Sequence, residues 1–571
     1  MPYTNPRWLI WLALTVLAYV LPDFDFSAIG EDAAAWVAVS GFHWGGIGHS
    51  RHETELHFQQ GRRLHDNGQL AEAERVFRET LAVDPEHAES MHRLGVIAMQ
   101  TGKMDSALAS FDQAIRRKRL NAIFHVHRAH ALLALRRSAD ALDAARQALR
   151  LKPQMAEGSF VLGHALSDLN RAAEAVAAYR DALRRDPRLP DLRNALALAL
   201  WEANRPTEAI ATLREAARHD PTDTATKQNL VGMLKDSGLL TEAEALARDI
   251  LRRRPDDAVT HFNLALTLFL AERFDDAWPE WAWRFRADPL IAMPFADREW
   301  GGEPPDGRIL LVHAEQGMGD AIQFCRYLDR IPAGTEVVLQ VHRPLVRLLS
   351  NHPNVAQTIA LDDAVPHYDL RVPIMSLPLA LGATGPADAA MTAPYITADG
   401  TQTAKWRALL PDRQTLRVGL VWAGNPERAR MDRRRSVPLA LLGPLLDVPG
   451  VSFISLQKGA AAADLALVPF GGKIYDASEV LDDFADTAAL IAELDLVIAA
   501  DTAVAHLAGA MGKPIWLLNR ADTCWRWGLG RTDSVWYPAL RQFRQETAGN
   551  WSSAIAQAAK ALPAFAAGGT A

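Results

Sequence analysis

The chain has 571 residues, of which 49% are hydrophobic and 23% are charged. This length corresponds to three or four domains at about 150 residues each, and the composition excludes a disordered, collagen-like or wholly transmembrane chain. The formal net charge of −7 gives no support to a nucleic-acid partner, because such partners are held by a basic surface. Two cysteines cannot form a disulfide framework, which is typical of a reducing compartment.

The chain begins with an apolar stretch. Residues 8–21 are apolar apart from Thr15 and follow Arg7. As a helix, this stretch would rise about 21 Å, which is short of the roughly 30 Å hydrocarbon core of a membrane. Three interpretations stay open: a membrane anchor or signal segment, a peripheral hydrophobic helix, and an extension that is irrelevant to the fold. We expect residues 1–50 to form a segment separate from the domains that follow.

Residues 54–291 contain an internal repeat of 34 residues. Prolines recur in this period, with Arg119 at the one position where the series is interrupted: Pro85, Pro153, Pro187, Pro221, Pro255 and Pro289. Alanines recur in the same period: Ala73, Ala107, Ala141, Ala175, Ala209, Ala243 and Ala277. The array predicts seven units of two antiparallel helices, because a proline cannot continue the helix that precedes it.

Two further columns predict how these helices pack. Small residues such as Gly95 recur in the first helix of each unit, and large residues such as Phe111 recur in the second. We expect the small residues to let the backbones approach closely and the large residues to fill the groove between units. The pattern resembles the tetratricopeptide repeat, which implies an α solenoid whose concave face binds partners. His125, His127 and His130 lie on one repeat helix, where we expect solvated surface rather than a metal site.

The last repeat changes character and precedes a domain boundary. Tryptophans are dense in residues 276–285, and Trp300 follows. A free solenoid end needs a polar cap, so this aromatic density predicts a packed junction with a neighbouring domain. Residues 292–307 contain scattered prolines and glycines and are expected to be the linker to a different fold.

From residue 308 onward, short apolar strands alternate with helical stretches. Strands are expected at residues 308–313, 336–341, 368–372, 416–422, 451–456, 494–499 and 514–518. Such alternation is typical of parallel sheets with crossover helices. The strands fall into two series, which predict a first Rossmann-like lobe at residues 308–397 and a second at residues 416–571, facing a cleft. A last helix at residues 551–562 is a candidate to cross back to the first lobe.

Two strand-to-helix turns are candidates for ligand binding, which in open parallel sheets occurs at the carboxyl ends of strands. The first turn, residues 317–320, lacks the third glycine of a dinucleotide-binding motif, and the chain has no Walker-type phosphate loop. In the second turn, Asp501 and Thr502 open a helix and His506 lies one turn further on the same face. The amides and the dipole of that helix suit a diphosphate. The sequence therefore argues against a dehydrogenase or P-loop enzyme.

These two turns carry a family resemblance. The stretch DTAVAHLAGAMGKP and the upstream GMGD turn resemble glycosyltransferase family 9, the heptosyltransferase-like enzymes. The segments EQGMGDAIQFCRYL, VGLVWAGNP, RRRSVPL and WRWGLGRTDSVWYPALRQFRQ are similar to bacterial tetratricopeptide proteins that carry such a domain. The resemblance implies an α/β two-lobed GT-B-like domain after the solenoid, a nucleotide-sugar donor, inversion at the anomeric carbon, no essential metal and no cofactor.

The resemblance also assigns roles to residues. Asp320 matches the aspartate proposed as general base, and Glu315 is its rival. The donor- and phosphate-binding residues are expected to be Gly317, Gly319, Arg434, Arg435, Asp501, Thr502 and His506. One carboxylate must take the acceptor's hydroxyl proton, and positive groups must stabilise the departing diphosphate.

Each of these assignments has a structural alternative. Asp320 sits where a helix N-cap belongs, and Asp501 and Thr502 are also suited to capping a helix. His506 fits a buried histidine with satisfied hydrogen bonds, and the arginines at residues 428–435 fit a solvated basic loop.

Two functions follow from these patterns. The first is an inverting, metal-independent glycosyltransferase whose repeat array selects a protein or glycan acceptor. The second is a non-catalytic tetratricopeptide scaffold with a degenerate transferase-like domain. The first lobe has only 90 residues, so either the solenoid supplies part of the acceptor surface, or the acceptor chemistry differs, or the site is degenerate. A nucleotide-sugar donor points to the cytoplasm, with membrane association through residues 8–21 left open.

Overall fold

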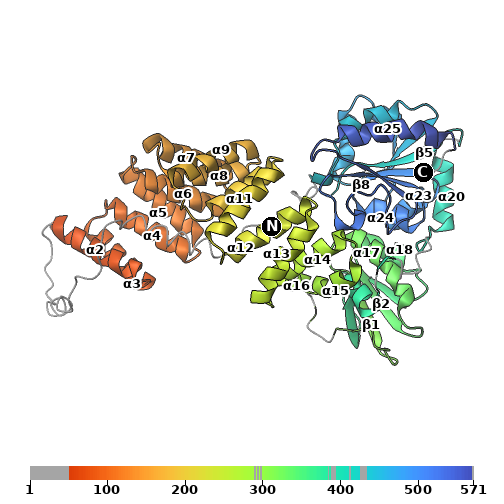
Figure 1. The fold of residues 1–571 in the computed structure, drawn as a ribbon, viewed down its shortest axis with the longest axis horizontal. Helices are drawn as coiled ribbons and strands as arrows, with labels where there is room; N and C mark the ends of the chain where they lie inside the picture. The colour runs from red at the N-terminus through yellow and green to blue at the C-terminus, as the bar shows by residue number, and fades with distance from the viewer. Residues whose placement is uncertain are drawn as a thin grey trace. The chain divides into compact units, whose positions relative to one another are not determined.

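The computed structural model describes residues 51–288, 291, 295, 299–383, 385–386, 394–410, 413–424 and 434–568. The chain divides into two compact units between Asp220 and Pro221 (Figure 1). The apolar stretch at residues 8–21, with the rest of residues 1–50, lies outside the described residues. Within the described part, no helix has the length and apolarity needed to cross a membrane.

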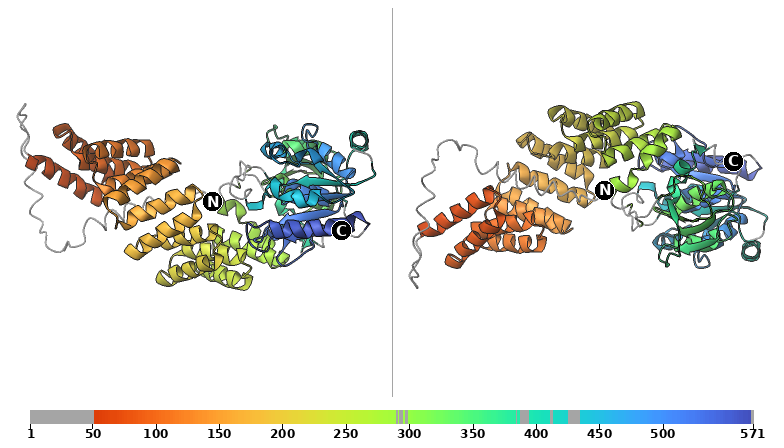
Figure 2. Two further views of the ribbon diagram at one scale, coloured as in Figure 1. Left: turned by 90° about the horizontal axis from the view of Figure 1, so that it is seen from above. Right: turned by 90° about the horizontal axis from the view of Figure 1, so that it is seen from below.

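Paired helices build the first unit, one pair for each 34-residue repeat (Figure 2). They are α2 (Arg51–Asp66), α3 (Leu70–Val83), α4 (Ala88–Gln100), α5 (Met104–Arg117), α6 (Ala122–Ala134), α7 (Ser138–Leu151), α8 (Ala156–Asp168), α9 (Ala172–Arg185), α10 (Leu192–Glu202) and α11 (Pro206–His219). The repeated proline sets their ends. In the first pair, α3 ends at Val83 and Asp84 is extended, because Pro85 disfavours a helical conformation in the residue before it.

Glycines of the first helices lie directly against aromatic rings of the second helices. A Cβ atom added at Gly95 would lie 2.5 Å from the ring of Phe111, and one at Gly163 would lie 2.4 Å from the ring of Tyr179. The small residues of the first helices therefore let the two helices of a repeat approach closely, as expected. The large residues pack inside their own repeat through these contacts. The ring of Phe111 also reaches the next repeat, where its centroid lies 5.8 Å from that of His127, as expected for the groove between units.

The histidines of α6 are buried, which contradicts the solvated surface expected from the sequence. His125, His127 and His130 are each at most 9% exposed. His92 of α4 stacks on His127, with ring centroids 4.8 Å apart and a hydrogen bond of 2.6 Å between Nε2 and Nδ1. Burial lowers the pKa of His127 and of His130 to about 3. These rings are neutral at pH 7 and belong to the packing between helices.

The second unit contains the last two helix pairs of the repeat as well as the parallel sheets. Its first helices are α12 (Thr224–Asp236), α13 (Leu240–Arg253), α14 (Ala258–Leu270), α15 (Phe274–Trp281) and α16 (Arg284–Ala287). The compact units therefore divide after the fifth helix pair, rather than where the repeat ends.

The first sheet of this unit has four parallel strands in the order β3-β2-β1-β4. The strands are β1 (Ile309–His313), β2 (Glu336–Val341), β3 (Gln357–Ala360) and β4 (Leu370–Pro373). The helical segments of this part are α17 (Met318–Phe324), η3 (Cys325–Arg330), η4 (Arg343–Leu345), α18 (Val346–Leu349), η5 (Ile374–Ser376) and α19 (Leu377–Ala380).

The second sheet has six parallel strands in the order β10-β9-β8-β5-β6-β7. The strands are β5 (Leu416–Val421), β6 (Val451–Ser455), β7 (Ile474–Asp476), β8 (Leu496–Ala500), β9 (Ile515–Asn519) and β10 (Leu540–Arg544). The helical segments are α20 (Gly400–Leu409), η8 (Leu439–Leu442), α22 (Gly443–Leu446), η9 (Ala460–Leu467), η10 (Gly471–Lys473), α23 (Phe484–Ala492), α24 (Ala503–Ala510), η11 (Trp525–Trp527) and α25 (Ser552–Ala566). Helix α25 packs on this sheet through Ile555 and Leu562, in one core with Trp516, and does not cross back as expected.

The strand order reverses once in each sheet. In the first sheet the chain moves from β1 to β2 and β3, and then places β4 on the other side of β1. In the second sheet it moves from β5 to β6 and β7, and then places β8 on the other side of β5. Ligands of open α/β sheets bind at the carboxyl ends of strands beside such a reversal.

Aromatic side chains join the last repeat to the α/β part. Phe269 of α14 stacks on Trp525 of η11 with ring centroids 4.4 Å apart. Trp278 of α15 meets Phe324 of α17 edge-on at 6.0 Å. Trp278 and Trp281 are almost fully buried. The packed junction predicted from the tryptophan-rich segment is therefore confirmed.

The buried histidines are expected to make the stability of the first unit depend on pH. Their pKa values are lowered by folding, so the unfolded chain binds more protons below about pH 6.5. The stabilisation from each such histidine is complete above this pH. As the pH falls from there toward the folded pKa, the free energy of unfolding decreases by about 1.4 kcal/mol per pH unit for each histidine. We expect the melting temperature of the first unit, followed in the full chain by circular dichroism, to fall as the pH is lowered from neutral to about 5.

His130→Leu removes one titrating group from this core, so its melting temperature should depend less steeply on pH. The matched control is His219→Gln, which changes an exposed histidine of α11 and should follow the wild-type curve. If His130→Leu keeps the wild-type slope, His130 does not contribute to the pH dependence.

Candidate functional site

The turn after β8 lies at the reversal point of the six-stranded sheet. Strand β8 consists of buried apolar residues, and Asp501 and Thr502 separate it from α24. Thr502 is the N-cap residue by its extended backbone, but its side chain makes no capping bond. Among the described residues, its hydroxyl oxygen is buried without a hydrogen-bond partner. An unsatisfied buried polar group costs about 1–3 kcal/mol, so a side-chain cap does not explain this threonine.

Asp320 lies in the first turn of α17, after β1. Gly317 is the N-cap of this helix, which corrects the capping position expected for Asp320. The Gly317 N–H donates to Oδ2 of Asp320 at 2.8 Å, and the other carboxylate oxygen forms an ion pair with Arg526. The Asp320 side chain is 17% exposed. The expected general base is thus accessible at its edge and has two partners.

Arg526 is, like Arg326, a buried cation of this region. It lies in η11, and its guanidinium donates to Asp320 and, through Nε, to Gln323 at 2.8 Å. Burial by itself would lower the pKa of Arg526, but the Asp320 carboxylate raises it above its ordinary value, and Asp501 acts in the same direction. Arg526 therefore stays positively charged beside the aspartates of both turns.

The two turns meet where α17 packs on α24 (Figure 1). A Cβ atom at Gly319 would lie 2.8 Å from Cδ2 of His506 and 3.4 Å from Cα of Ala503. A larger residue at position 319 would push the two helices apart. The structure thus gives Gly319 a packing role between the helices, in addition to its place in the expected ligand turn.

His506 is buried at this helix contact. Its Nδ1 lies 2.8 Å from the hydroxyl of Tyr537, and its ring stacks on Trp527 at 5.0 Å between centroids. Burial lowers the pKa of His506 to about 4, so the ring is neutral at pH 7. These contacts favour the alternative of a satisfied buried histidine, because a neutral ring adds no positive charge for a diphosphate.

Glu315, the rival base, is held by a buried ion pair. Its carboxylate receives hydrogen bonds from Arg284 at 2.7–3.0 Å and from the N–H of Met375 at 3.2 Å. The Glu315 side chain is 0% exposed and that of Arg284 is 1% exposed. Burial raises the pKa of Glu315, and the Arg284 guanidinium offsets part of that rise. Glu315 therefore connects α16 to the turn after β1 and offers no free oxygen to a substrate, which corrects its assignment as a base.

The basic residues after β5 reach the same sheet edge as Asp501. Arg434 forms an ion pair of 2.6 Å with Asp522, which follows β9. The Nε atom of Arg435 is buried. The other arginines of this loop, at residues 428–433, lie outside the described residues.

The sequence analysis gave no role to Arg284 or Arg526. Both lie in tryptophan-rich segments, and both are buried with an acidic partner. A charge inside such an apolar segment requires a partner of opposite sign when it is buried. The position of each arginine in the sequence therefore indicated a buried ion pair. The partners Glu315 and Asp320 could not be paired with them, because each pair joins segments that are distant in the sequence.

Comparison with known proteins identifies the helical region. The tetratricopeptide repeat family model matches residues 58–122, 94–156, 126–187, 160–224 and 234–289. The helical region consists of tetratricopeptide repeats. The curated Protein FlbA of Caulobacter vibrioides is 30% identical over 335 residues, which cover 53% of this chain and 54% of that protein. The chain thus spans about half the length of the curated relative it matches.

Parts of the chain are similar to proteins of known structure. A thermophilic tetratricopeptide protein of Thermus thermophilus is 22% identical, with a TM-score of 0.28, and the match covers 32% of this chain and 98% of that chain. A MamA fragment from Desulfovibrio magneticus is 16% identical, with a TM-score of 0.28, and the match covers 30% of this chain and 97% of that chain.

The helix contact at Gly319 is expected to tolerate no side chain. Gly319→Ala places a Cβ against the His506 ring, and such overpacking destabilises by about 1–3 kcal/mol. The measurement is the free energy of unfolding of the second unit in denaturant, followed by tryptophan fluorescence. Gly400→Ala is the matched control, because a Cβ there would meet nothing within 4 Å. Equal stability of the two variants would contradict the packing role of Gly319.

Removing one partner of the Arg284–Glu315 ion pair is expected to lower the free energy of unfolding more than replacing both partners by uncharged residues. Glu315→Gln leaves a buried guanidinium without its counter-ion, for which we expect a loss of about 3–5 kcal/mol in unfolding free energy. The double variant Arg284→Met/Glu315→Gln should lose less than the sum of the two single variants. Arg343→Gln, which breaks an exposed pair with Asp362, should change stability little. Additive losses in the double variant would refute a direct coupling.

Proposed function

We propose that this protein is a glycosyltransferase that uses a nucleotide-sugar donor and selects a protein or glycan acceptor through its repeats. The observation that carries the proposal is the meeting of the two expected ligand turns. Asp501 and Thr502 open α24 at the reversal of the six-stranded sheet, and Asp320 lies on α17, which packs on α24. The resemblance of both turns to glycosyltransferase family 9 supports a GT-B-like arrangement of the two sheets.

The donor diphosphate is proposed to bind at the N-terminus of α24. The backbone amides and the dipole of this helix favour an anion, and the unpartnered hydroxyl of Thr502 offers a further hydrogen bond. Arg434 lies at the same sheet edge, and Arg526 lies between the two turns. These two guanidinium groups balance the charge that the diphosphate gains as the bond to the sugar breaks.

Proton transfer is proposed to take place at Asp320. The acceptor hydroxyl oxygen forms the new bond to the anomeric carbon while its proton passes to the Asp320 carboxylate. The bonding electrons of the old glycosidic bond leave with the nucleoside diphosphate, and the configuration is inverted. A diphosphate that draws Arg526 toward itself would weaken the pair between Arg526 and Asp320 and free one carboxylate oxygen for the proton.

The last repeat is proposed to align the acceptor with this site. The buried pair of Arg284 and Glu315 and the aromatic contacts of Phe269 and Trp278 hold the last repeat against the α/β part. Repeat arrays of this kind bind partners along their surface. An acceptor bound by the last two repeats would therefore approach the α/β part in a defined orientation.

A non-catalytic scaffold is the second candidate function. The pairing of Asp320 with Arg526 and the packed state of His506 favour it, because both side chains are held by partners within the fold. In that case the repeats bind partners and the α/β part contributes no turnover.

A thermal-shift panel of nucleoside diphosphates and their sugars on the full chain distinguishes the two functions. Binding to the native state raises the melting temperature by mass action. For a transferase, we expect one nucleotide sugar to stabilise the chain and to be hydrolysed or transferred. Thr502→Val should reduce the shift, whereas Asp320→Asn should keep it and lower turnover at least a hundredfold.

The matched control is Asp399→Asn, which removes a carboxylate that caps α20 and should leave both readouts unchanged. Absence of any shift and of any hydrolysis over the whole panel would support the scaffold. Full activity of Asp320→Asn would remove Asp320 from the role of base.

A further inference from the structure

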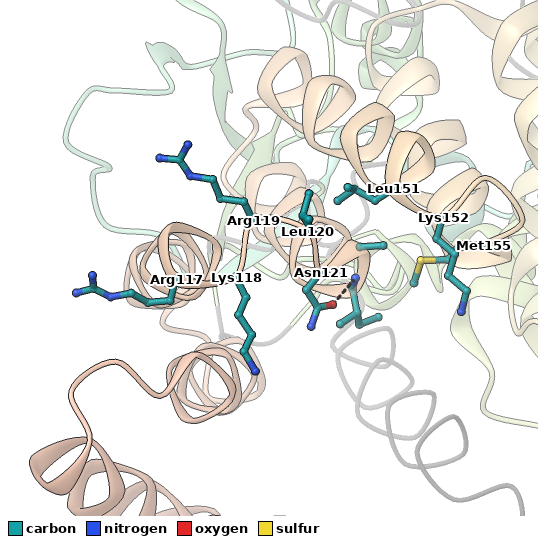
Figure 3. Close-up of a pocket in the computed structure, with 10 residues that line it drawn as sticks. Arg117, Lys118, Arg119, Leu120, Asn121, Leu151, Lys152 and Met155 are labelled. Atoms are coloured by element: carbon teal, nitrogen blue, oxygen red, sulfur yellow. Dashed lines mark hydrogen bonds between the residues drawn. The ribbon is translucent and has the colours of Figure 1, made fainter. Parts of the chain in front are cut away.

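A pocket of about 870 Å³ lies in the first unit, at the loops that join α5 to α6 and α7 to α8 (Figure 3). The first loop contributes residues 117–121, and the second contributes Lys152 and Met155. This pocket is formed by connections between repeats rather than by the columns that pack the solenoid. It belongs to a different compact unit from the transferase-like site.

The pocket coincides with a local departure from the repeat. Leu120 is 82% exposed. The same position is polar in five of the six other repeats, at Glu86, Gln154, Arg188, Thr222 and Asp256, and is a leucine again at residue 290 of the last repeat. Arg119 replaces the recurrent proline. Lys118 and Lys152 stand where four other repeats have an aspartate and one has Arg254: Asp84, Asp186, Asp220 and Asp288. Packing does not require these changes, since most of the other repeats fold with a polar residue at the position of Leu120 and all of them with proline at the position of Arg119.

The departure produces an apolar opening with a cationic rim. Leu120, Leu151 and Met155 lie around the opening, and the guanidinium groups of Arg117 and Arg119 extend outward (Figure 3). An exposed apolar patch bordered by polar groups marks an interaction site. Burying Leu120 against a partner would recover the hydrophobic free energy that its exposure forfeits.

The charges of the rim select an acidic partner. Arg117 pairs with Glu86 at 2.8 Å, and Lys118 pairs with Glu89. Among the described residues, no acidic side chain lies within ion-pair distance of Arg119. A phosphate backbone carries no apolar side chain to cover Leu120, whereas a peptide can place one there beside carboxylates that reach Arg119. A small inorganic anion would leave Leu120 uncovered.

We propose that this pocket binds an acidic peptide segment of a partner protein, which inserts one apolar side chain beside Leu120 and places carboxylates near Arg119 and Lys152. This site is independent of the transferase-like site. Its affinity is expected to fall as salt is added, because part of the attraction is between exposed charges.

The test measures fluorescence anisotropy of a labelled nonapeptide, with one leucine flanked by four acidic residues on each side, on titration with the full chain. Comparison peptides replace the leucine by serine, or every acidic residue by its amide. We expect the acidic leucine peptide to bind at least tenfold more tightly than either.

Two variants follow the residues of other repeats, so they are expected to fold. Leu120→Gln takes the residue of the next repeat, and Arg119→Pro restores the recurrent proline. Leu120→Gln should weaken the binding of the leucine peptide at least tenfold and leave the affinity for the serine peptide unchanged. Arg119→Pro should make the affinity for the leucine peptide depend less on salt concentration. Arg188→Gln, in the same exposed column, is the matched control and should bind like the wild type.

Equal affinity for the acidic peptide and its amide version would overturn the proposal, as would an unchanged affinity in Leu120→Gln with wild-type circular dichroism. Tighter binding to anionic lipid vesicles or to an oligonucleotide, lost in Leu120→Gln and Arg119→Pro, would assign the pocket to a membrane or a nucleic acid instead and would equally overturn it.

Discussion

The close approach of two helix N-termini is the constraint on which the α/β part depends. Gly319 of α17 lies against His506 of α24, and this contact brings the turn after β1 to the turn after β8. The contact requires a residue without a side chain at position 319, and burial keeps the imidazole at position 506 neutral although Asp501 and Asp320 are near. It places Asp320, Arg526 and Asp501 in one region, where opposite charges share a partly buried environment.

Buried arginines connect parts of the chain that are distant in sequence. Arg284 joins the end of the repeat to the turn after β1, and Arg526 joins η11 to α17. A guanidinium suits both positions, since its planar set of donors can satisfy a carboxylate and neighbouring acceptors together. The aromatic rings around these pairs exclude water and strengthen each hydrogen bond. As a result, the last two repeats and both sheets form one compact unit, and the first five repeats form another.

The repeat array combines regular packing with local exceptions. In the regular part, most repeats place a glycine or alanine of the first helix against the second helix, so stability accumulates from similar units. At residues 117–120 the repeat keeps its helix lengths but changes the polarity and charge of the connecting loop. The exception lies outside the packing columns, where a change is tolerated by the fold and is available for recognition.

The sequence alone determined the elements with strong periodicity. The 34-residue spacing identified the helix pairs, because proline and glycine act locally on the backbone, and continuous apolar runs identified strands such as β1, β5 and β8. Strands β3, β7 and β10 were missed, since they are short or carry polar and charged residues within the sheet. Tertiary structure alone decided that the histidines of α6 are buried, that α25 stays with the second sheet, and that Glu315 and Asp320 are paired with arginines. These outcomes depend on which surfaces meet across long sequence separations, and no local pattern of residues encodes that information.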